Sequence, residues 1–179
     1  MAIWDGFVDG PGRTTALRAV MECLAETDTC EALIARLASA ANRAHLSDRA
    51  LRVQYGERTL VLKPPHVSDV AAAVPASCER LARTINGIVV VGGSWQWFGL
   101  DGDGALVSGL PDVRTPIRHH DDWLAYHPEV ETALGEPALC RYHRGAFDPP
   151  LSLDLGMPAT ILRLLVLSLL GDRDVPWQR

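Results

Sequence analysis

The sequence predicts an α+β protein in which helices pack on a mostly antiparallel sheet, preceded by an N-terminal helical hairpin. Three observations predict this class. Apolar residues recur every three or four positions in the first quarter of the chain, which is typical of amphipathic helices. The apolar period changes to two at Leu51, and several short strand-like runs follow. Because helices and strands occupy separate stretches and do not alternate, the pattern favours α+β over a doubly wound α/β fold.

Residues 13–46 are expected to form two antiparallel helices. Apolar positions of the first are Leu17, Val20, Met21 and Leu24. The second runs from about Cys30 to His45, and Thr27-Asp28-Thr29 offers its N-cap, because these side chains accept hydrogen bonds from the free N–H groups of a helix start. We interpret the two helices as an extension of a sheet-containing core over 50–179, within a single domain.

A β-hairpin and a central strand are expected next. Apolar and polar residues alternate over 51–55, and Gly56-Glu57 follows as the turn. In the second strand Leu60 and Leu62 alternate with Thr59, Val61 and Lys63, which leaves one buried face. Pro64-Pro65 ends the second strand, because proline lacks the N–H group that a ladder needs. The uninterrupted β-branched run from Ile88 to Val91 is typical of a strand at the centre of a sheet.

The remaining elements are predicted from shorter signals. A helix starts at Pro75 and ends at about Thr84, because Asn86-Gly87 can adopt the left-handed conformation of a C-cap. Pro158 opens a last helix, and Gly171 closes it. The other expected features are a strand–turn–strand over 95–107, a strand within 113–117, a short strand or helical turn at 123–126, a strand at 138–142 and a rigid break at 148–150.

Composition and charge limit the classes of function. The chain has 179 residues, of which 47% are hydrophobic, and this is enough for one domain with a buried core. The net charge is −5, from 17 basic and 22 acidic residues. There is no basic stripe, so we expect no binding to nucleic acid through its phosphates. The acidic balance suits solubility and could also steer a basic partner.

The sequence predicts neither a membrane segment nor a secretory leader. The longest apolar stretch, Ile161 to Leu170, is shorter than the about 20 residues that cross a hydrocarbon core. Met1 to Phe7 contains no basic region and no long apolar run. The four scattered cysteines are expected to be buried thiols and not disulfides. Together these features predict a cytoplasmic protein.

Two segments carry a family resemblance. In the first, the helix Pro75-Ala-Ser-Cys-Glu-Arg-Leu leads into Asn86-Gly87-Ile88, a β-branched run and Gly99-Leu100. The second contains Trp123-Leu-Ala-Tyr-His-Pro128 and Gly135-Glu136-Pro137-Ala138-Leu139. This pattern resembles the SUKH superfamily, which contains bacterial immunity proteins against polymorphic toxins and fungal regulators of cell-wall synthesis. The chain departs from that pattern in its long helical stretch before the hairpin and in its unusually apolar last helix.

The resemblance implies an α+β sheet in which a helix ending in Asn-Gly feeds a core strand. It also implies a non-enzymatic protein that binds and neutralises a bacterial polymorphic or contact-dependent toxin. Because the family shares no catalytic residues, Pro75, Asn86, Gly87 and Gly99 are carried over only as structural positions. No cofactor is expected.

The densest group of candidate metal ligands is His119-His120-Asp121-Asp122, to which His127, Glu136 and Cys140-x-x-His143 could add. Imidazole, thiolate and carboxylate groups bind zinc, so a metal-dependent enzyme built on this group is an alternative function. Adjacent histidines point to opposite faces of a strand, however. We therefore favour a polar surface loop and predict no metal site.

The other motifs with a chemical association are interpreted as turns. Asp101-Gly-Asp103-Gly resembles the start of a calcium loop, but its twelfth position is Asp112 and not the bidentate glutamate that such a loop needs. Ser94, after Gly92-Gly93, has neither the phosphate-loop ending nor the nucleophile-elbow pattern. No catalytic residue is predicted.

Trp95 and Trp97 fall on one face of the expected strand, and Phe98 falls on the other. With Phe98 inside, the two indoles would form an outward binding surface rimmed by acidic residues. With the indoles inside, they belong to the core, which is the more usual place for large aromatic residues. The retained binding hypothesis comprises Trp95, Trp97, Asp101, Asp103, His119, His120, Asp121 and Asp122.

The last helix is apolar on nearly all sides. It either completes the core or packs against a second copy of the chain, which would give a homodimer. The expected partner is a protein, with a cognate toxin domain as the leading hypothesis. A regulatory scaffold subunit with an endogenous partner is the remaining alternative.

Overall fold

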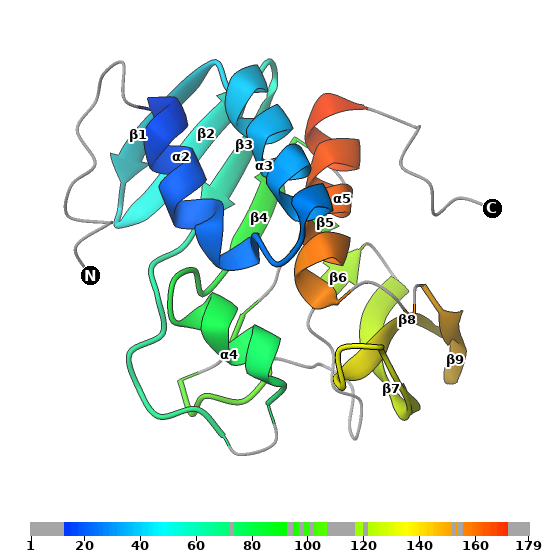
Figure 1. Cartoon of the computed structure of the whole chain (residues 1–179). Coiled ribbons are helices and arrows are strands. Elements are labelled where there is room, and N and C mark those ends of the chain that lie inside the picture. Colours follow the sequence, from blue (N-terminus) through cyan, green and yellow to red (C-terminus); the bar gives the residue numbers. More distant parts are fainter. Residues whose placement is uncertain are drawn as a thin grey trace.

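A computed structural model describes residues 13–71, 74–92, 95–96, 99–100, 102–106, 117–119, 122–151, 153 and 156–171. Within these residues the chain has an α+β fold, as the sequence predicts. Three helices, α2 (Arg13–Met21), α3 (Asp28–Ala40) and α5 (Met157–Leu170), lie next to one another on one face of the sheet (Figure 1). No helix of the described part is long and apolar enough to cross a bilayer.

The N-terminal helical hairpin is confirmed. Helix α2 (Arg13–Met21) runs into a short 3-10 helix, η1 (Glu22–Leu24), and α3 (Asp28–Ala40) returns against it. Thr27 is the N-cap of α3, and its hydroxyl oxygen accepts a hydrogen bond from the backbone N–H of Cys30 at 3.2 Å. One of the predicted N-cap residues therefore does begin the helix.

The expected end of the second helix is wrong. Helix α3 ends at Ala40, five residues before His45, and the chain then forms strand β1 (Arg43–Ser47). The backbone N–H of Asn42 already donates to the Gln54 carbonyl, and β1 continues this pairing along β2. Pairing with a neighbouring strand overrides the weak helical propensity of such a short segment.

The strands form a single antiparallel sheet in which spatial order follows chain order. The predicted hairpin is confirmed as β2 and β3, and the β-branched run is an interior strand, β4, hydrogen-bonded on both sides. The bounds of strands β2 to β9 are Ala50–Tyr55, Arg58–Leu62, Ile88–Val91, Trp95–Gln96, Ile117–His119, Asp122–Glu131, Pro137–His143 and Ala146–Pro150.

The second half of the sheet differs in part from expectation. Strand β5 pairs with β4 and β6, and an isolated bridge joins Leu100 to Leu106. Trp97, Phe98 and Val107 of the expected strand–turn–strand lie outside the described residues. The short element expected at 123–126 is part of the ten-residue strand β7. The break expected at 148–150 is instead the end of β9. Strand β9 pairs only with β8, and such an edge strand tolerates prolines.

Two more helices complete the fold. Helix α4 (Ala76–Ala82) follows Pro75, which is its N-cap. Helix α5 (Met157–Leu170) contains Pro158 in its first turn and ends at Gly171, whose φ of 69° gives the left-handed C-cap that the sequence predicts. Most of the α5 side chains are buried within one chain, among helices α3 and α4 and strands β3 and β4. The apolar helix thus completes a core, and a homodimer formed through it stays a prediction.

Candidate functional site

Three of the predicted binding residues lie in one row across the sheet. The register places Trp95 of β5 opposite His119 of β6, and His119 opposite Asp122 of β7. The structure describes the backbones of these three residues. Directly paired residues on adjacent strands are the closest cross-strand neighbours in a sheet. The row therefore brings together an aromatic, an imidazole and a carboxylate residue that lie 27 positions apart at its extremes.

Four other residues of the binding hypothesis lie outside the described residues: Trp97, Asp101, His120 and Asp121. Within the part of the chain whose side chains are described, no group of three or more His, Cys, Asp or Glu residues could hold a metal ion. The side chains of His119 and Asp122 are not in that part, so the metal hypothesis for 119–122 stays a prediction.

Asp103 belongs to a different feature, the turn over residues 102–106. This turn is held against the loop that precedes α4, because the backbone N–H of Ala71 donates to the Gly104 carbonyl at 3.1 Å. Gly104 has a φ of +77°, and a Cβ added there would lie 2.2 Å from the backbone oxygen of Asp69. Only glycine fits this approach. Asp103 is exposed, and it lies on a turn whose backbone is held against residues 69–71.

The residues that carry the family resemblance have structural contacts. The Asn86 side-chain amide donates to the Leu100 carbonyl at 3.0 Å and accepts from the Leu100 N–H at 2.6 Å. Gly87 has a φ of +148°, and its carbonyl accepts from the Lys63 N–H at 2.8 Å. These contacts attach the start of β4 both to β3 and to the chain that follows β5.

Glu136 belongs to the second segment that resembles the SUKH superfamily, and its side chain binds the start of α4. One carboxylate oxygen accepts from the Ser77 N–H at 2.8 Å, and the other accepts from the Ser77 hydroxyl. Because Pro75 provides no side-chain cap, Glu136 from the β7–β8 turn takes that role for the helix. At the next residue of the helix, the Cys78 sulfur lies 2.8 Å from the Tyr126 hydroxyl, and both side chains are buried.

The thiols of the described cysteines are free, as expected, and three of them are weak acids here. Burial raises the pKa of Cys23 and of Cys78 to about 12 and that of Cys140 to about 11. Burial also raises the pKa of Tyr126 well above its ordinary value. At neutral pH these groups are protonated, and a protonated thiol is a poor nucleophile.

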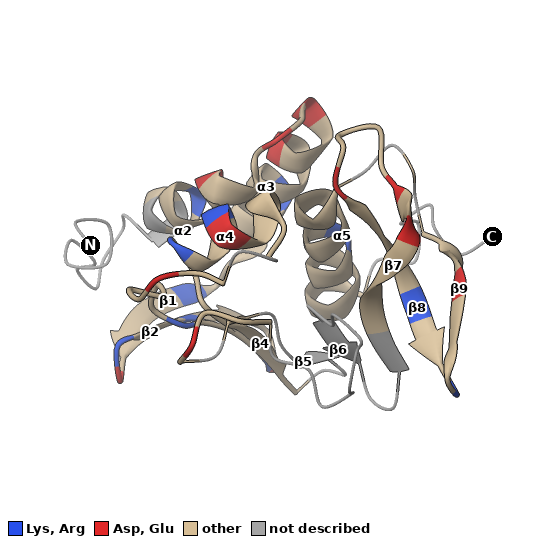
Figure 2. Ribbon diagram, turned by 90° about the horizontal axis from the view of Figure 1, so that it is seen from below, with Lys and Arg blue, Asp and Glu red and all other residues tan. Residues whose placement is uncertain are grey.

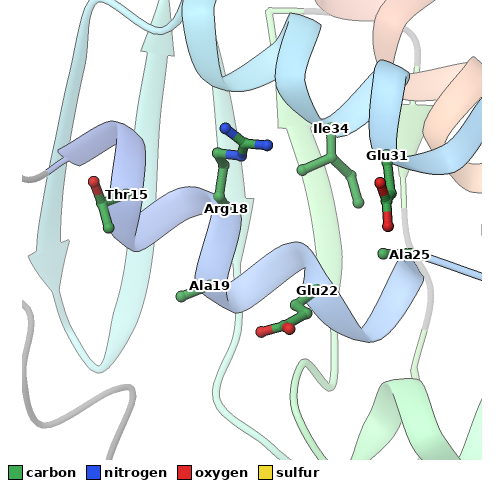
Figure 3. A pocket seen from close by; sticks show the side chains of 7 residues that line it. All are labelled: Thr15, Arg18, Ala19, Glu22, Ala25, Glu31 and Ile34. Atoms are coloured by element: carbon green, nitrogen blue, oxygen red, sulfur yellow. The ribbon is translucent and has the colours of Figure 1, made fainter. Parts of the chain in front are cut away.

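One open pocket lies between α2 and α3, with a volume of about 480 Å³. Figure 3 shows Ile34 and Glu31 projecting from α3, with Arg18 on α2 and Glu22 at the start of η1. The sequence pattern does not indicate this pocket, because charged residues on the outer faces of two amphipathic helices give no signal of how the helices pack. The full set of lining residues is Thr15, Arg18, Ala19, Glu22, Ala25, Glu31 and Ile34.

No family model, curated protein or solved structure matches this chain. The resemblance to the SUKH superfamily therefore rests on the residues alone and stays a prediction.

Proposed function

We propose that this protein is a non-enzymatic binding protein of the SUKH type, which acts in the bacterial cytoplasm as an immunity protein. It would bind a polymorphic or contact-dependent toxin domain and cover its active surface. A preformed interface of this kind typically buries about 1,200–2,000 Å² in total. The acidic balance of the chain would speed its encounter with a basic toxin domain.

The observation that carries the proposal is the row formed by Trp95, His119 and Asp122. Aromatic residues are enriched among those that dominate binding energy at protein interfaces. Backbone pairing between adjacent strands fixes the spacing of these three positions. A binding surface that is formed in advance lowers the entropic cost of association.

The contacts of Asn86, Gly87 and Glu136 agree with this proposal. Each of them holds one part of the backbone to another. For Asn86 and Gly87 this is the role that the resemblance implies, since the family has no shared catalytic residues and these positions are carried over only as structure. The binding surface of such a protein then lies elsewhere on the same scaffold.

Co-expression tests the proposal. The toxin domain encoded by the neighbouring large open reading frame is induced in a bacterial host with and without this chain, and survival is measured. We expect survival only when the chain is present, and a stoichiometric complex in light scattering. The triple variant Trp95→Ala, His119→Ala, Asp122→Ala should lose protection, whereas the matched variant Arg52→Ala, Thr59→Ala on β2 and β3 should keep it.

Unchanged toxicity when the purified proteins fail to associate would overturn this proposal. Protection that survives the triple variant would leave the immunity role standing but would remove the row from the interface. An endogenous partner in place of the toxin would favour the regulatory scaffold.

A second candidate is a metal-dependent protein, and the pairing of His119 with Asp122 is the observation that favours it. Imidazole and carboxylate at a strand connection can be two ligands of one zinc ion. Metal analysis of protein purified without a histidine tag decides between the two. A stoichiometric metal content that is lost in His119→Ala would support this candidate, and a content near zero would remove it.

A further inference from the structure

Two exposed leucines lie in chain segments that are hydrogen-bonded to each other. Leu134, in the turn between β7 and β8, is 55% exposed, and Leu153, in the segment before α5, is 52% exposed. The backbone N–H of Ala133 donates to the Leu153 carbonyl at 2.9 Å, so the two segments are directly attached. Large aliphatic side chains in such adjacent, exposed positions form an apolar patch on the surface.

Glu26 borders this patch, although it comes from the distant link between η1 and α3. A Cβ added at Gly156 would lie 3.2 Å from Leu134 Cδ1 and 3.3 Å from a Glu26 carboxylate oxygen. The side chains of Leu134 and Glu26 thus both lie close to the buried backbone of Gly156. We call Glu26, Leu134, Leu153 and Gly156 the Leu134 surface.

The chain segments around the Leu134 surface are strongly acidic. Residues 22–31 and 127–140 contain no Lys or Arg. Figure 2 shows acidic positions at the start of α3 and on the neighbouring β7–β8 hairpin. The acidic residues of the two segments are Glu22, Glu26, Asp28, Glu31, Glu129, Glu131 and Glu136.

Some of this charge is already paired. Glu26 forms an ion pair with Arg80 of α4, and Glu136 binds Ser77. Asp28, Glu129 and Glu131 are exposed. An excess of exposed carboxylates beside apolar side chains repels phosphates and anionic lipids, and it attracts lysine and arginine.

We propose that the Leu134 surface docks a basic segment of a partner protein, whose apolar side chains contact Leu134 and Leu153 while its lysines or arginines face the surrounding carboxylates. The inference rests on the proposed function as a binding protein, and it names the chemistry of the partner. The two leucines would supply the apolar contact and the carboxylates the charge complementarity, which is the usual division between the centre and the rim of an interface.

The test uses short fluorescent peptides, because these need no knowledge of the natural partner. The probe contains lysine and leucine, and its two controls replace either lysine by glutamate or leucine by serine. Anisotropy with the full chain should give binding of the Lys/Leu probe that is at least about tenfold tighter than binding of either control. This binding should weaken as salt is added, because the rim charges are screened.

Matched variants locate the binding. Leu134→Ser with Leu153→Ser should weaken binding of the probe by at least about tenfold. Leu46→Ser with Val67→Ser removes two exposed apolar residues outside the Leu134 surface and should leave binding within about twofold. All four positions are exposed, so the variants should fold. Gly156→Ala, which pushes on Leu134 and Glu26, should weaken binding without removing either residue.

Four results would overturn the inference. These are the absence of Lys/Leu binding, equal binding of the Glu/Leu peptide, equal losses in the two double variants, and toxin protection that the leucine double variant leaves unchanged. Its failure is distinguishable from failure of the proposed function. Toxin protection that is unaffected by Leu134→Ser with Leu153→Ser removes the inference alone, whereas absent protection with normal peptide binding removes the immunity role alone.

Discussion

The side chain of Asn86 binds the backbone of Leu100 as the backbone of a neighbouring strand would. Its amide nitrogen donates to the Leu100 carbonyl at 3.0 Å, and its amide oxygen accepts from the Leu100 N–H at 2.6 Å. One side chain therefore satisfies both polar groups of a buried residue, Leu100, which is 3% exposed. The contact attaches the loop after α4 to the chain beyond β5, and four predictions follow from this and related contacts.

Replacing Asn86 with alanine should destabilise the fold by about 2–3 kcal/mol, because the change leaves a buried N–H and a buried carbonyl of Leu100 without partners. Urea denaturation followed by circular dichroism measures this loss. Asn42→Ala is the matched control, since Asn42 accepts one exposed hydrogen bond from Gly56 and its loss should cost less than about 1 kcal/mol. Equal costs for the two variants would contradict the role given to Asn86.

Gly104→Ala should destabilise the protein by about 2 kcal/mol or more. The new Cβ would lie 2.2 Å from the backbone oxygen of Asp69, and the φ of +77° is unfavourable for alanine. Gly102 lies in the same turn, and a Cβ there would have no neighbour within 4 Å, so Gly102→Ala should change stability by less than about 0.5 kcal/mol. Thermal melts of the two variants give the comparison, and similar midpoints would show that the turn does not pack on 69–71.

Removal of the Glu136 carboxylate should destabilise the first turn of α4. Glu136→Ala leaves the Ser77 N–H and hydroxyl without their acceptors in a site where Ser77 is 2% exposed, and we expect a cost of about 2–3 kcal/mol. Hydrogen exchange of the α4 amides should rise with it. Glu129→Ala removes an exposed carboxylate of the same hairpin and should leave the α4 exchange unchanged. If α4 stays equally protected in both variants, Glu136 is not its cap.

Stability should fall in alkaline solution because of the buried pair Cys78 and Tyr126. Burial raises the pKa of Cys78 to about 12, whereas an unfolded cysteine ionises at about 8.5. Above that lower value the unfolded chain releases a proton that the folded chain retains, so the free energy of unfolding decreases as pH rises towards 12, by up to about 1.4 kcal/mol per pH unit for this group. Below about pH 8 the Cys78 thiol keeps its proton in both the folded and the unfolded chain, so it adds no pH dependence to the free energy of unfolding.

Denaturation midpoints at pH 8 and pH 10 test this dependence. Cys78→Ala should flatten the decrease, although it also lowers stability at both pH values by leaving a small cavity. A decrease of the same slope in the variant would assign the alkaline sensitivity to other groups, such as the half-buried Cys23, whose pKa is also raised to about 12.

Much of the fold could be predicted because several signals are local. Thr27 caps α3 through an atom three residues away, and Gly56 closes its hairpin by adopting a positive φ of 59°. Helix α5 has both its start and its end in the residues around Pro158 and Gly171. The β-branched run of β4 favours an interior strand, and β4 is hydrogen-bonded on both sides. These elements depend on propensity and on neighbours in the chain, so a single sequence contains the information.

The tertiary structure decided what depends on partners distant in the chain. Residues 43–47 and 146–150 became edge strands because a paired strand was available beside each, and their own patterns were too short to predict this. Likewise, Glu136 became the cap of α4 from 59 residues away, and Leu134 met Glu26 over Gly156. Periodicity shows which side chains need burial, but only packing determines which surfaces meet, and the proposed binding surface is formed by such a meeting.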